Sequence, residues 1–175
     1  MTRPGRDEAP APGIDPVAFR GVAGRFATGV TVVTSGVDGD HHAMTANSFT
    51  SVSLDPVLAL VSVDRAARFH DVVLRGGVFG VSVLAEDQQE AAQWFAVRGR
   101  AHDLSQFAEH PHRFGDRTGV VLLERALATI ECTTYAVHEA GDHTLVIGEV
   151  VAMALPRPED RPLVFFAGAY RSLAD

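Results

Sequence analysis

The sequence contains no lysine, and all 15 of its basic residues are arginine. With 22 acidic residues, the chain carries a net charge of −7 at neutral pH. A nucleic-acid surface needs clustered cations that displace counterions from phosphates. The charge balance therefore argues against a nucleic-acid partner, while the use of arginine suits any site that holds a phosphate by a fork of donors.

The sequence also lacks a second cysteine and any long apolar run. Cys132 cannot form an internal disulfide and is expected to be a buried small hydrophobe. No apolar run approaches the roughly 20 residues that span a bilayer, and the amino terminus has no secretory signal. These absences predict no membrane association and a cytoplasmic location. Among the eight histidines only His110 and His112 show a paired ligand spacing on one predicted element, in what we interpret as a solvated loop, so no metal site is predicted.

Four familiar catalytic signatures are missing. The sequence has no G-x-G-x-x-G after a strand and no phosphate loop ending in G-K-S or G-K-T, which argues against a Rossmann or P-loop nucleotide site. It has no G-x-S-x-G elbow and no H-E-x-x-H pair, so serine hydrolase and zinc protease chemistry have no support.

The 175 residues suffice for one domain, which we place at residues 15–175 after a Pro- and Ala-rich tail over residues 1–14. Asp15 and Pro16 predict a helix start, with Phe19, Val22 and Phe26 on one face of a helix that ends near Ala27. Further helices are expected over residues 66–75, ending at a Gly pair, and over 86–98, with Ala91, Trp94 and Phe95 on one side. Residues 99–117 are expected to be irregular, with one helical turn at most.

About seven strands are expected. Residues 30–35 and 41–46 predict a hairpin across a turn that contains Asp and Gly. Residues 57–63 and 78–84 predict strands buried on both faces, and the remaining strands are expected at residues 126–140, 144–155 and 163–166. Because strands and helices do not alternate regularly, the expected fold is mainly β with added helices, in an antiparallel barrel.

Residues 44–56 (MTANSFTSVSLDP) form the most distinctive stretch of the chain. Five hydroxyls and one amide follow a strand and precede another, and such short side chains hydrogen-bond to nearby backbone or to a ligand. We interpret the stretch as a loop, ended by Asp55 and Pro56. Composition alone leaves open whether it only connects two strands.

Five pieces of the chain, in order, resemble the short flavin reductases that supply reduced flavin to two-component monooxygenases. The resemblance covers residues 19–173, nearly the whole chain. The pieces are residues 27–34 (ATGVTVVT), 44–56 (MTANSFTSVSLDP), 63–71 (VDRAARFHD), 140–150 (AGDHTLVIGEV) and 162–171 (PLVFFAGAYR).

This resemblance implies an antiparallel split β-barrel of the FMN-binding, Greek-key type, a homodimer with flavin near the subunit interface, and hydride transfer from NADH or NADPH to FMN or FAD. A separate oxygenase would receive the reduced flavin. The implied flavin contacts are Thr45, Ala46, Asn47 and Ser48 around the ring and ribityl chain, Thr50, Ser51 and Ser53 toward ribityl and phosphate, and Thr31 on the strand behind the ring.

The resemblance also assigns roles outside this loop. Arg68, at the start of a predicted helix, is implied as a phosphate contact, and Asp64 is the expected cap of that helix. Arg65 beside it is equally well explained as solvated. His143 is implied as a clamp on the nicotinamide, while Tyr170 and Arg171 would cover the flavin or the nucleotide, or else serve packing. The family commonly has asparagine at the position of Ser82 and arginine at that of Ala167; without the latter cation, NADH is the expected donor rather than NADPH.

Two alternatives keep the barrel. One is a flavin-binding electron carrier or sensor that holds its cofactor without turnover. The other is an oxidase of the pyridoxamine phosphate type, which needs a cationic site for a phosphorylated substrate and is disfavoured by the few arginines near the carboxyl end.

Overall fold

The computed structural model describes residues 13–173. The predicted tail, residues 1–14, lies almost entirely outside this range. Helices are α1 (Pro16–Ala23), α2 (Arg68–Gly76) and α3 (Gln89–Ala96), with 3-10 turns η1 (Glu86–Gln88) and η2 (Leu104–Phe107). Strands are β1 (Thr28–Gly29), β2 (Thr31–Val37), β3 (Asp40–Ala46), β4 (Thr50–Leu54), β5 (Val57–Asp64), β6 (Val78–Val83), β7 (His112–Phe114), β8 (Val121–Leu123), β9 (Ala128–Ala140), β10 (His143–Ala154), β11 (Val164–Phe166) and β12 (Ala169–Arg171).

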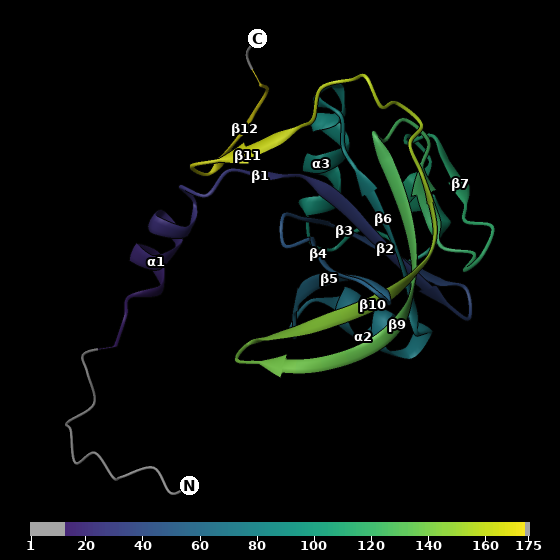
Figure 1. Cartoon of the computed structure of the whole chain (residues 1–175), viewed down its shortest axis with the longest axis horizontal. Helices are drawn as coiled ribbons and strands as arrows, with labels where there is room; N and C mark the ends of the chain where they lie inside the picture. Colours follow the sequence, from purple (N-terminus) through teal and green to yellow (C-terminus); the bar gives the residue numbers. More distant parts are fainter. Residues whose placement is uncertain (1–12, 174–175) are drawn as a thin grey trace, which may run out of the picture.

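A seven-stranded sheet in the order β3-β2-β6-β9-β10-β5-β4 forms the body of the molecule (Figure 1). Every pair in it is antiparallel, which confirms the mainly β, antiparallel prediction. Strands β3 and β4 are its two edges, and within residues 13–173 no ladder closes the sheet between them. The small hairpin β11–β12 pairs with β1 in a separate sheet.

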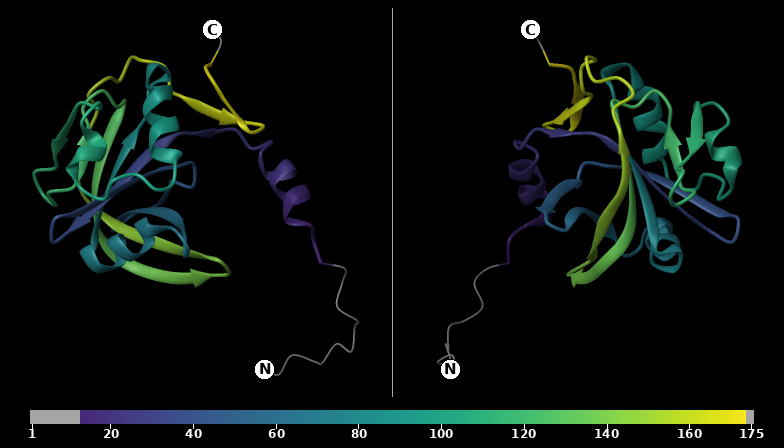
Figure 2. Two further views of the ribbon diagram at one scale, coloured as in Figure 1. Left: turned by 180° about the vertical axis from the view of Figure 1, so that it is seen from behind. Right: turned by 45° about the vertical axis from the view of Figure 1, so that its right-hand side comes forward.

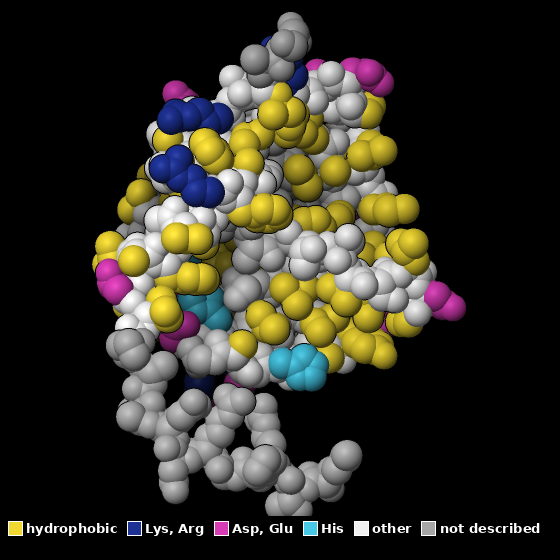
Figure 3. All heavy atoms as spheres, turned by 60° about the vertical axis from the view of Figure 1, so that its left-hand side comes forward, with side chains coloured by type: hydrophobic (Ala, Val, Ile, Leu, Met, Phe, Trp, Pro, Cys, Tyr) yellow, Lys and Arg dark blue, Asp and Glu magenta, His cyan; other side chains and the backbone are white. Residues whose placement is uncertain are grey.

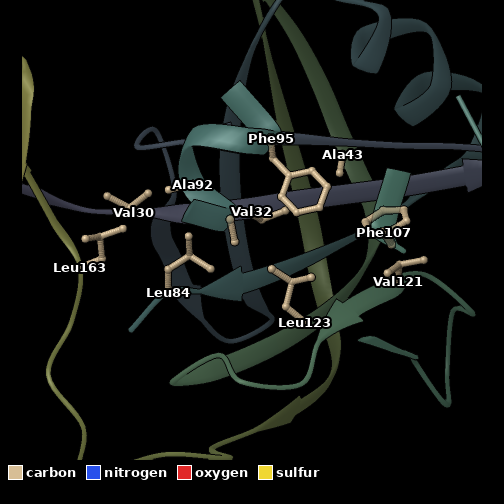
Figure 4. Packing of buried hydrophobic residues seen from close by; sticks show 11 residues of the cluster. Val30, Val32, Ala43, Leu84, Ala92, Phe95, Phe107, Val121, Leu123 and Leu163 are labelled. Atoms are coloured by element: carbon tan, nitrogen blue, oxygen red, sulfur yellow. The ribbon is translucent and has the colours of Figure 1, made fainter. Parts of the chain in front are cut away.

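Two hydrophobic cores lie on opposite faces of this sheet, because alternate residues of β2 point to opposite sides. Val32 packs with Phe95 of α3, Phe107 of η2 and the buried β8 residues, as Figure 4 shows. Val33 instead packs with Phe69 of α2 and the alternate core positions of the neighbouring strands. The ends of α2 and α3 therefore approach β3 from opposite faces of the sheet.

Turn chemistry accounts for the elements that the sequence predicts well. Asp15 caps α1 by accepting hydrogen bonds from Val17 and Ala18. The turn between β2 and β3 places Asp38 and Gly39 at φ 52° and 81°, the left-handed geometry of a tight hairpin. Helix α2 ends because Gly77 adopts φ 65° and donates its N–H to the carbonyl of Val73.

Several boundaries differ from the predictions. Residues 44–56 are not one loop, because β3 continues to Ala46 and Thr50–Leu54 form the edge strand β4. Strand β5 has only one fully buried face, since Leu58, Leu60 and Ser62 on its other face are only partly buried. Residues 86–98 form a 3-10 turn followed by a helix that ends at Ala96, and Trp94 is 43% exposed. Residues 99–117, expected to be irregular, contain η2 and β7.

Helix α1 is shorter than predicted and carries its apolar face outward. It ends at Ala23, so Phe26 lies beyond it, and none of its residues is buried. Figure 2 shows this helix standing away from the main sheet. Over residues 13–173 there is no helix of the length and apolar character that crossing a bilayer requires.

Candidate functional site

A first cavity of about 200 Å³ opens where β3 leaves the sheet. Three of its lining residues belong to the predicted flavin loop. One precedes β2, one ends α3, and two belong to the β11–β12 hairpin. The lining residues are Val30, Thr45, Ala46, Asn47, Ala96, Phe165 and Tyr170. An apolar cavity with a few polar groups at its edge is the usual form of a site for a flat aromatic ligand.

The β11–β12 hairpin supplies the aromatic wall of this cavity. Phe165 and Tyr170 face each other across the two strands, and their ring centroids lie 5.5 Å apart in a T-shaped arrangement. Both rings pack against the core cluster of Val30 and Phe95. The wall therefore rests on buried core rather than on a free loop.

A second cavity of about 370 Å³ adjoins the first, because Thr45 and Ala96 line both. Its walls come from β3, from the start of α2 and from the segment that follows α3. Basic side chains predominate among its titratable lining residues, which are His42, Asp64, Arg68, Arg98, Arg100 and His102. The predicted phosphate contact Arg68 and the predicted ring contacts thus lie in neighbouring cavities.

The start of α2 forms part of this second cavity and has no side-chain cap. Ala67 occupies the cap position, and within the described chain no side chain accepts a hydrogen bond from the first-turn amides. The prediction that Asp64 caps α2 is therefore wrong. Its carboxylate accepts from Ala66 N–H at 2.8 Å, in the turn before the helix. Uncapped amides at a helix start favour an anion.

Arg68 is held at the cavity by an acidic neighbour on β3. Its Nη2 and the Nη2 of Arg75 each lie 3.0 Å from the same Oδ2 of Asp40. The side chain of Arg68 remains 48% exposed, so this guanidinium has donors left for a ligand.

Arg100 is a buried cation that ties α3 to β3. It is 8% exposed, and its guanidinium donates to the carbonyls of Trp94 at 2.9 Å and Ala43 at 2.6 Å, and also to that of Val97. Two of these carbonyls belong to the end of α3, where free acceptors accumulate. Burial lowers the pKa of this guanidinium. Arg100 thereby sets the position of Ala96 relative to β3, and so the width of both cavities.

Thr45 makes a further side-chain hydrogen bond between β3 and α3. Its hydroxyl donates to the carbonyl of Ala92 in α3 at 2.6 Å. The hydroxyl proton is therefore used within the protein, and only the oxygen lone pairs face the cavities.

His42 is uncharged at neutral pH. Burial, and next the nearby Arg100 charge, lower its pKa to about 4. The positive charge of the second cavity therefore comes from its arginines.

The other residues of the predicted flavin loop lie outside the two cavities. Thr31 is buried, and its hydroxyl donates to the carbonyl of Ala46 at 2.8 Å. The hydroxyl of Ser48 donates to the carbonyl of Ser62 and accepts from its N–H. Thr50, Ser51 and Ser53 belong to the edge strand β4, where they pair with β5. Their ligand roles remain predictions, and the hydrogen bonds of Thr31 and Ser48 are made within the protein.

His143 begins β10 at the tip of the long β9–β10 hairpin. Its Nδ1 lies 2.7 Å from Oδ1 of Asp142, and this hydrogen bond lowers the pKa of that carboxyl. In the β5–β10 ladder His143 is paired with Asp64, which lines the second cavity. Directly paired side chains lie on one face of a sheet, so the imidazole stands beside the rim of that cavity.

Arg171 lines neither of the two cavities, although Tyr170 beside it lines the first. It lines a further cavity with Tyr170 and Glu86, and its guanidinium donates to the carbonyl of Tyr170. Within residues 13–173 there is no group of three potential metal ligands. Cys132 is buried as expected, and burial raises the pKa of its thiol to about 12.

Sequence reasoning missed Arg98, Arg100 and His102. All three follow the end of α3 in the stretch RGRAH, which places three basic side chains within five residues. This local density of cations after a helix was the available signal. What it did not reveal is that the segment folds back onto β3, where His41 N–H donates to the carbonyl of His102 at 3.0 Å.

Known proteins with similar sequences and structures include several flavin reductases. Residues 23–174 match the family model described as "Flavin reductase like domain". An NADH-dependent flavin reductase of Rhodococcus sp is 44% identical over 165 residues, covering 93% of this chain and 89% of that protein. An NADH-dependent FAD reductase of Streptomyces globisporus is 40% identical, covering 94% and 91%. The crystal structure of BorF, the flavin reductase component of a bacterial two-component tryptophan halogenase, superposes with a TM-score of 0.86 at 46% identity, covering 92% and 99%.

Proposed function

Since this chain belongs to the flavin reductase-like family, we propose that it is an NADH-dependent flavin reductase. It reduces FMN or FAD and supplies the reduced flavin to a separate oxygenase component. The observation that carries this proposal is the apolar first cavity, whose rim is formed by Thr45, Ala46 and Asn47.

The residues of the first cavity fit an isoalloxazine ring. Such a ring is an apolar plane with a polar edge, and it requires an apolar wall and hydrogen-bonding groups along one rim. Val30, Phe165 and Tyr170 supply the wall, while Asn47 and the backbone beside it supply the rim. When bound, the flavin supplies the hydride-accepting chemistry, and the protein contributes orientation and exclusion of water.

A flavin phosphate fits the start of α2. Arg68 presents a half-exposed guanidinium there, and the first-turn amides lack a side-chain cap. Both features stabilise an anion, one by charge-assisted hydrogen bonds and one by the helix dipole.

His143 orients the nicotinamide in this proposal. The carboxylate of Asp142 accepts a hydrogen bond from the imidazole and thereby holds its ring orientation. This role would require no proton shuttle from His143, because the bound cofactors would supply the hydride transfer themselves.

The proposal is tested by the loss of NADH absorbance when FMN or FAD is added to the purified chain. Flavin-dependent oxidation of NADH supports a reductase. A yellow protein that keeps its flavin through desalting and oxidises no NADH would instead support a carrier or sensor. Turnover of a phosphorylated pyridoxamine substrate without NADH would support the oxidase alternative.

We expect substitutions at the two ends of the site to separate flavin binding from NADH binding. Asn47→Ala should raise the KM for flavin about tenfold and leave the KM for NADH within about twofold, because it removes one rim hydrogen bond. His143→Ala should do the reverse. Steady-state kinetics with each substrate varied gives both constants. Loss of folded protein in Asn47→Ala, seen by thermal melting, would assign the residue a structural role instead.

The split-barrel form of the sheet is also part of this proposal. The two edge strands β3 and β4 are consecutive in the chain, and Ser48 between them hydrogen-bonds to both peptide groups of Ser62 in β5. These contacts hold the two edges near each other without a ladder. An experimental structure in which Ser48 and Ser62 lie apart would contradict it.

We further propose a homodimer in which α1 packs against the second copy. Ile14, Val17 and Val22 are each more than 70% exposed, at 81%, 71% and 73%. Figure 3 shows hydrophobic side chains spread over this side of the molecule with few charges between them. Exposed apolar surface of this kind marks an interface. Light scattering should give twice the mass of one chain, and a monomer at micromolar concentration would contradict the proposal.

The cytoplasmic location stays a prediction, to be tested by cell fractionation.

A further inference from the structure

The second cavity is larger and more cationic than a single phosphate group requires. It measures about 370 Å³, against about 200 Å³ for the cavity that fits the flavin ring. The second cavity has nearly twice the volume of the first, so it has room for a group much larger than one phosphate. Because Thr45 and Ala96 line both cavities, one elongated ligand can occupy them together.

The charge of the second cavity is opposite to that of the chain. Three arginines and one carboxylate line it, whereas the whole sequence carries −7. Arg100 is 8% exposed, lines the cavity, and its Nε has no hydrogen-bond partner among the described residues. The uncapped start of α2 adds free amides to the same wall. The cavity therefore holds more hydrogen-bond donors than a single phosphate group can use, and enough for two.

Aromatic rings complete the cavity. The imidazoles of His42 and His102 meet edge to face with centroids 5.4 Å apart, and that of His42 lies 6.4 Å from the Phe69 ring. His102 is exposed, and His42 is neutral because its pKa is lowered to about 4. Nucleobases stack on such rings, whereas a lone phosphate gains nothing from them.

We propose that the second cavity binds the adenylate half of a dinucleotide flavin, so that this chain prefers FAD to FMN. The inference rests on the proposed function, because it places the flavin ring in the first cavity. Arg68 and the start of α2 contact the phosphate that both flavins carry. Arg98 and His102 contact the part that only FAD carries, with Arg98 on the second phosphate and His102 against the adenine.

Arg98 is well suited to exchange its present partner for a ligand. Its side chain is 85% exposed, and its Nη2 lies 3.4 Å from Oδ2 of Asp64. An exposed ion pair of this length contributes little to stability. A ligand phosphate can therefore replace the carboxylate without disturbing the fold.

The test measures KM for FAD, FMN and NADH in the full chain and in four variants. In the unmodified chain, KM for FAD should be about tenfold below that for FMN, as one added charge-assisted contact and one stacked base predict. Arg98→Ala and His102→Ala should each raise KM for FAD about fivefold to tenfold and leave KM for FMN within about twofold. Arg68→Ala should raise both. Arg117→Ala removes an exposed arginine outside the cavities and should change none of them.

Other outcomes contradict the inference in distinguishable ways. Equal KM values for FAD and FMN, or an equal rise of both in Arg98→Ala, would mean that the cavity does not recognise adenylate. A rise in KM for NADH alone would place the adenylate of the nicotinamide cofactor there instead. Each of these results leaves the reductase function standing. Absence of NADH oxidation with either flavin would overturn the function itself.

Discussion

Replacing Arg100 with alanine should weaken flavin binding and destabilise the fold together, although the side chain contacts neither predicted ring position. Its guanidinium donates to the carbonyls of Trp94, Val97 and Ala43, and the substitution removes this donor from all three. Ala43 is fully buried, whereas the carbonyl of Trp94 keeps the N–H of Val97 as a donor. A buried acceptor that loses its partner costs about 1–3 kcal/mol. Since water can enter from the adjoining cavity and satisfy part of the set, we expect a loss of about 3 kcal/mol in the free energy of unfolding.

The functional effect follows from the position of Ala96. This residue lines both cavities and lies between the carbonyls that Arg100 holds. Without Arg100, the hydrogen bond from Thr45 to Ala92 and the packing of Phe95 with Ala43 remain to tie this part of α3 to β3. The cavity wall at Ala96 then moves more freely. KM for FMN should rise at least about tenfold, since small misplacements in a preorganised site weaken binding by that factor or more.

Denaturant unfolding and steady-state kinetics with FMN test this prediction. Arg117→Ala is the matched control, because it removes the same side chain from an exposed position and should change neither quantity. Arg100→Lys keeps the charge but cannot reach three carbonyls with a planar fork, so it should recover less than half of the lost stability. A stable Arg100→Ala variant with unchanged KM would show that α3 is positioned by core packing alone.

The elements predicted correctly are those whose signal is local. Asp15 with Pro16, the Asp38 and Gly39 turn, and Gly77 after α2 each determine a boundary through their own backbone geometry or capping chemistry. The residue pattern likewise located β5, β6, β9 and β10, but not the short strands β7 and β8. None of these inferences needs knowledge of what lies across the sheet.

The errors occurred where the partner that a residue takes in the fold outweighs what its own type favours. β4 is rich in Ser and Thr and was interpreted as loop, yet its backbone pairs with β5 from residue 50 to 54. Trp94 was placed with the apolar side of its helix, but its indole donates to the carbonyl of Gln106 and stays 43% exposed. Asp64 resembles a helix cap in sequence, and its carboxylate instead serves Ala66 and Arg98.

The candidate site likewise has one part that the local sequence predicts and one part that it does not. Thr45, Ala46 and Asn47 were predicted from a continuous motif and do line the first cavity. The second cavity is formed by residues from β3, the start of α2 and the segment after α3, which are separated by tens of positions in the sequence. Only the fold brings His42, Arg68 and Arg98 together, so no local pattern predicts their joint charge.

Gly148→Ala in β10 should strongly destabilise the fold. A Cβ there would lie 2.5 Å from Cε1 of Phe79 and 2.6 Å from Cβ of Cys132, closer than real carbon contacts. The Phe79 ring is buried in the core and has little room to turn. The Cβ of Cys132 is attached directly to the backbone of β9, so relief at that contact requires strands β9 and β10 to separate.

Overpacking of this kind typically costs 1–3 kcal/mol, and the second, backbone-anchored contact places Gly148→Ala at about 3 kcal/mol. For a domain of this size this lowers Tm by about 6–12 °C, measured by thermal melting at one protein concentration. Gly29→Ala is the control, since its Cβ would meet nothing within 4 Å. Adding Phe79→Leu to Gly148→Ala should recover only part of the penalty, because Cys132 remains in place. Full recovery of Tm in the double variant would mean that the Phe79 ring causes the whole penalty. An unchanged Tm in Gly148→Ala would mean that strands β9 and β10 separate far more easily than a close-packed core allows.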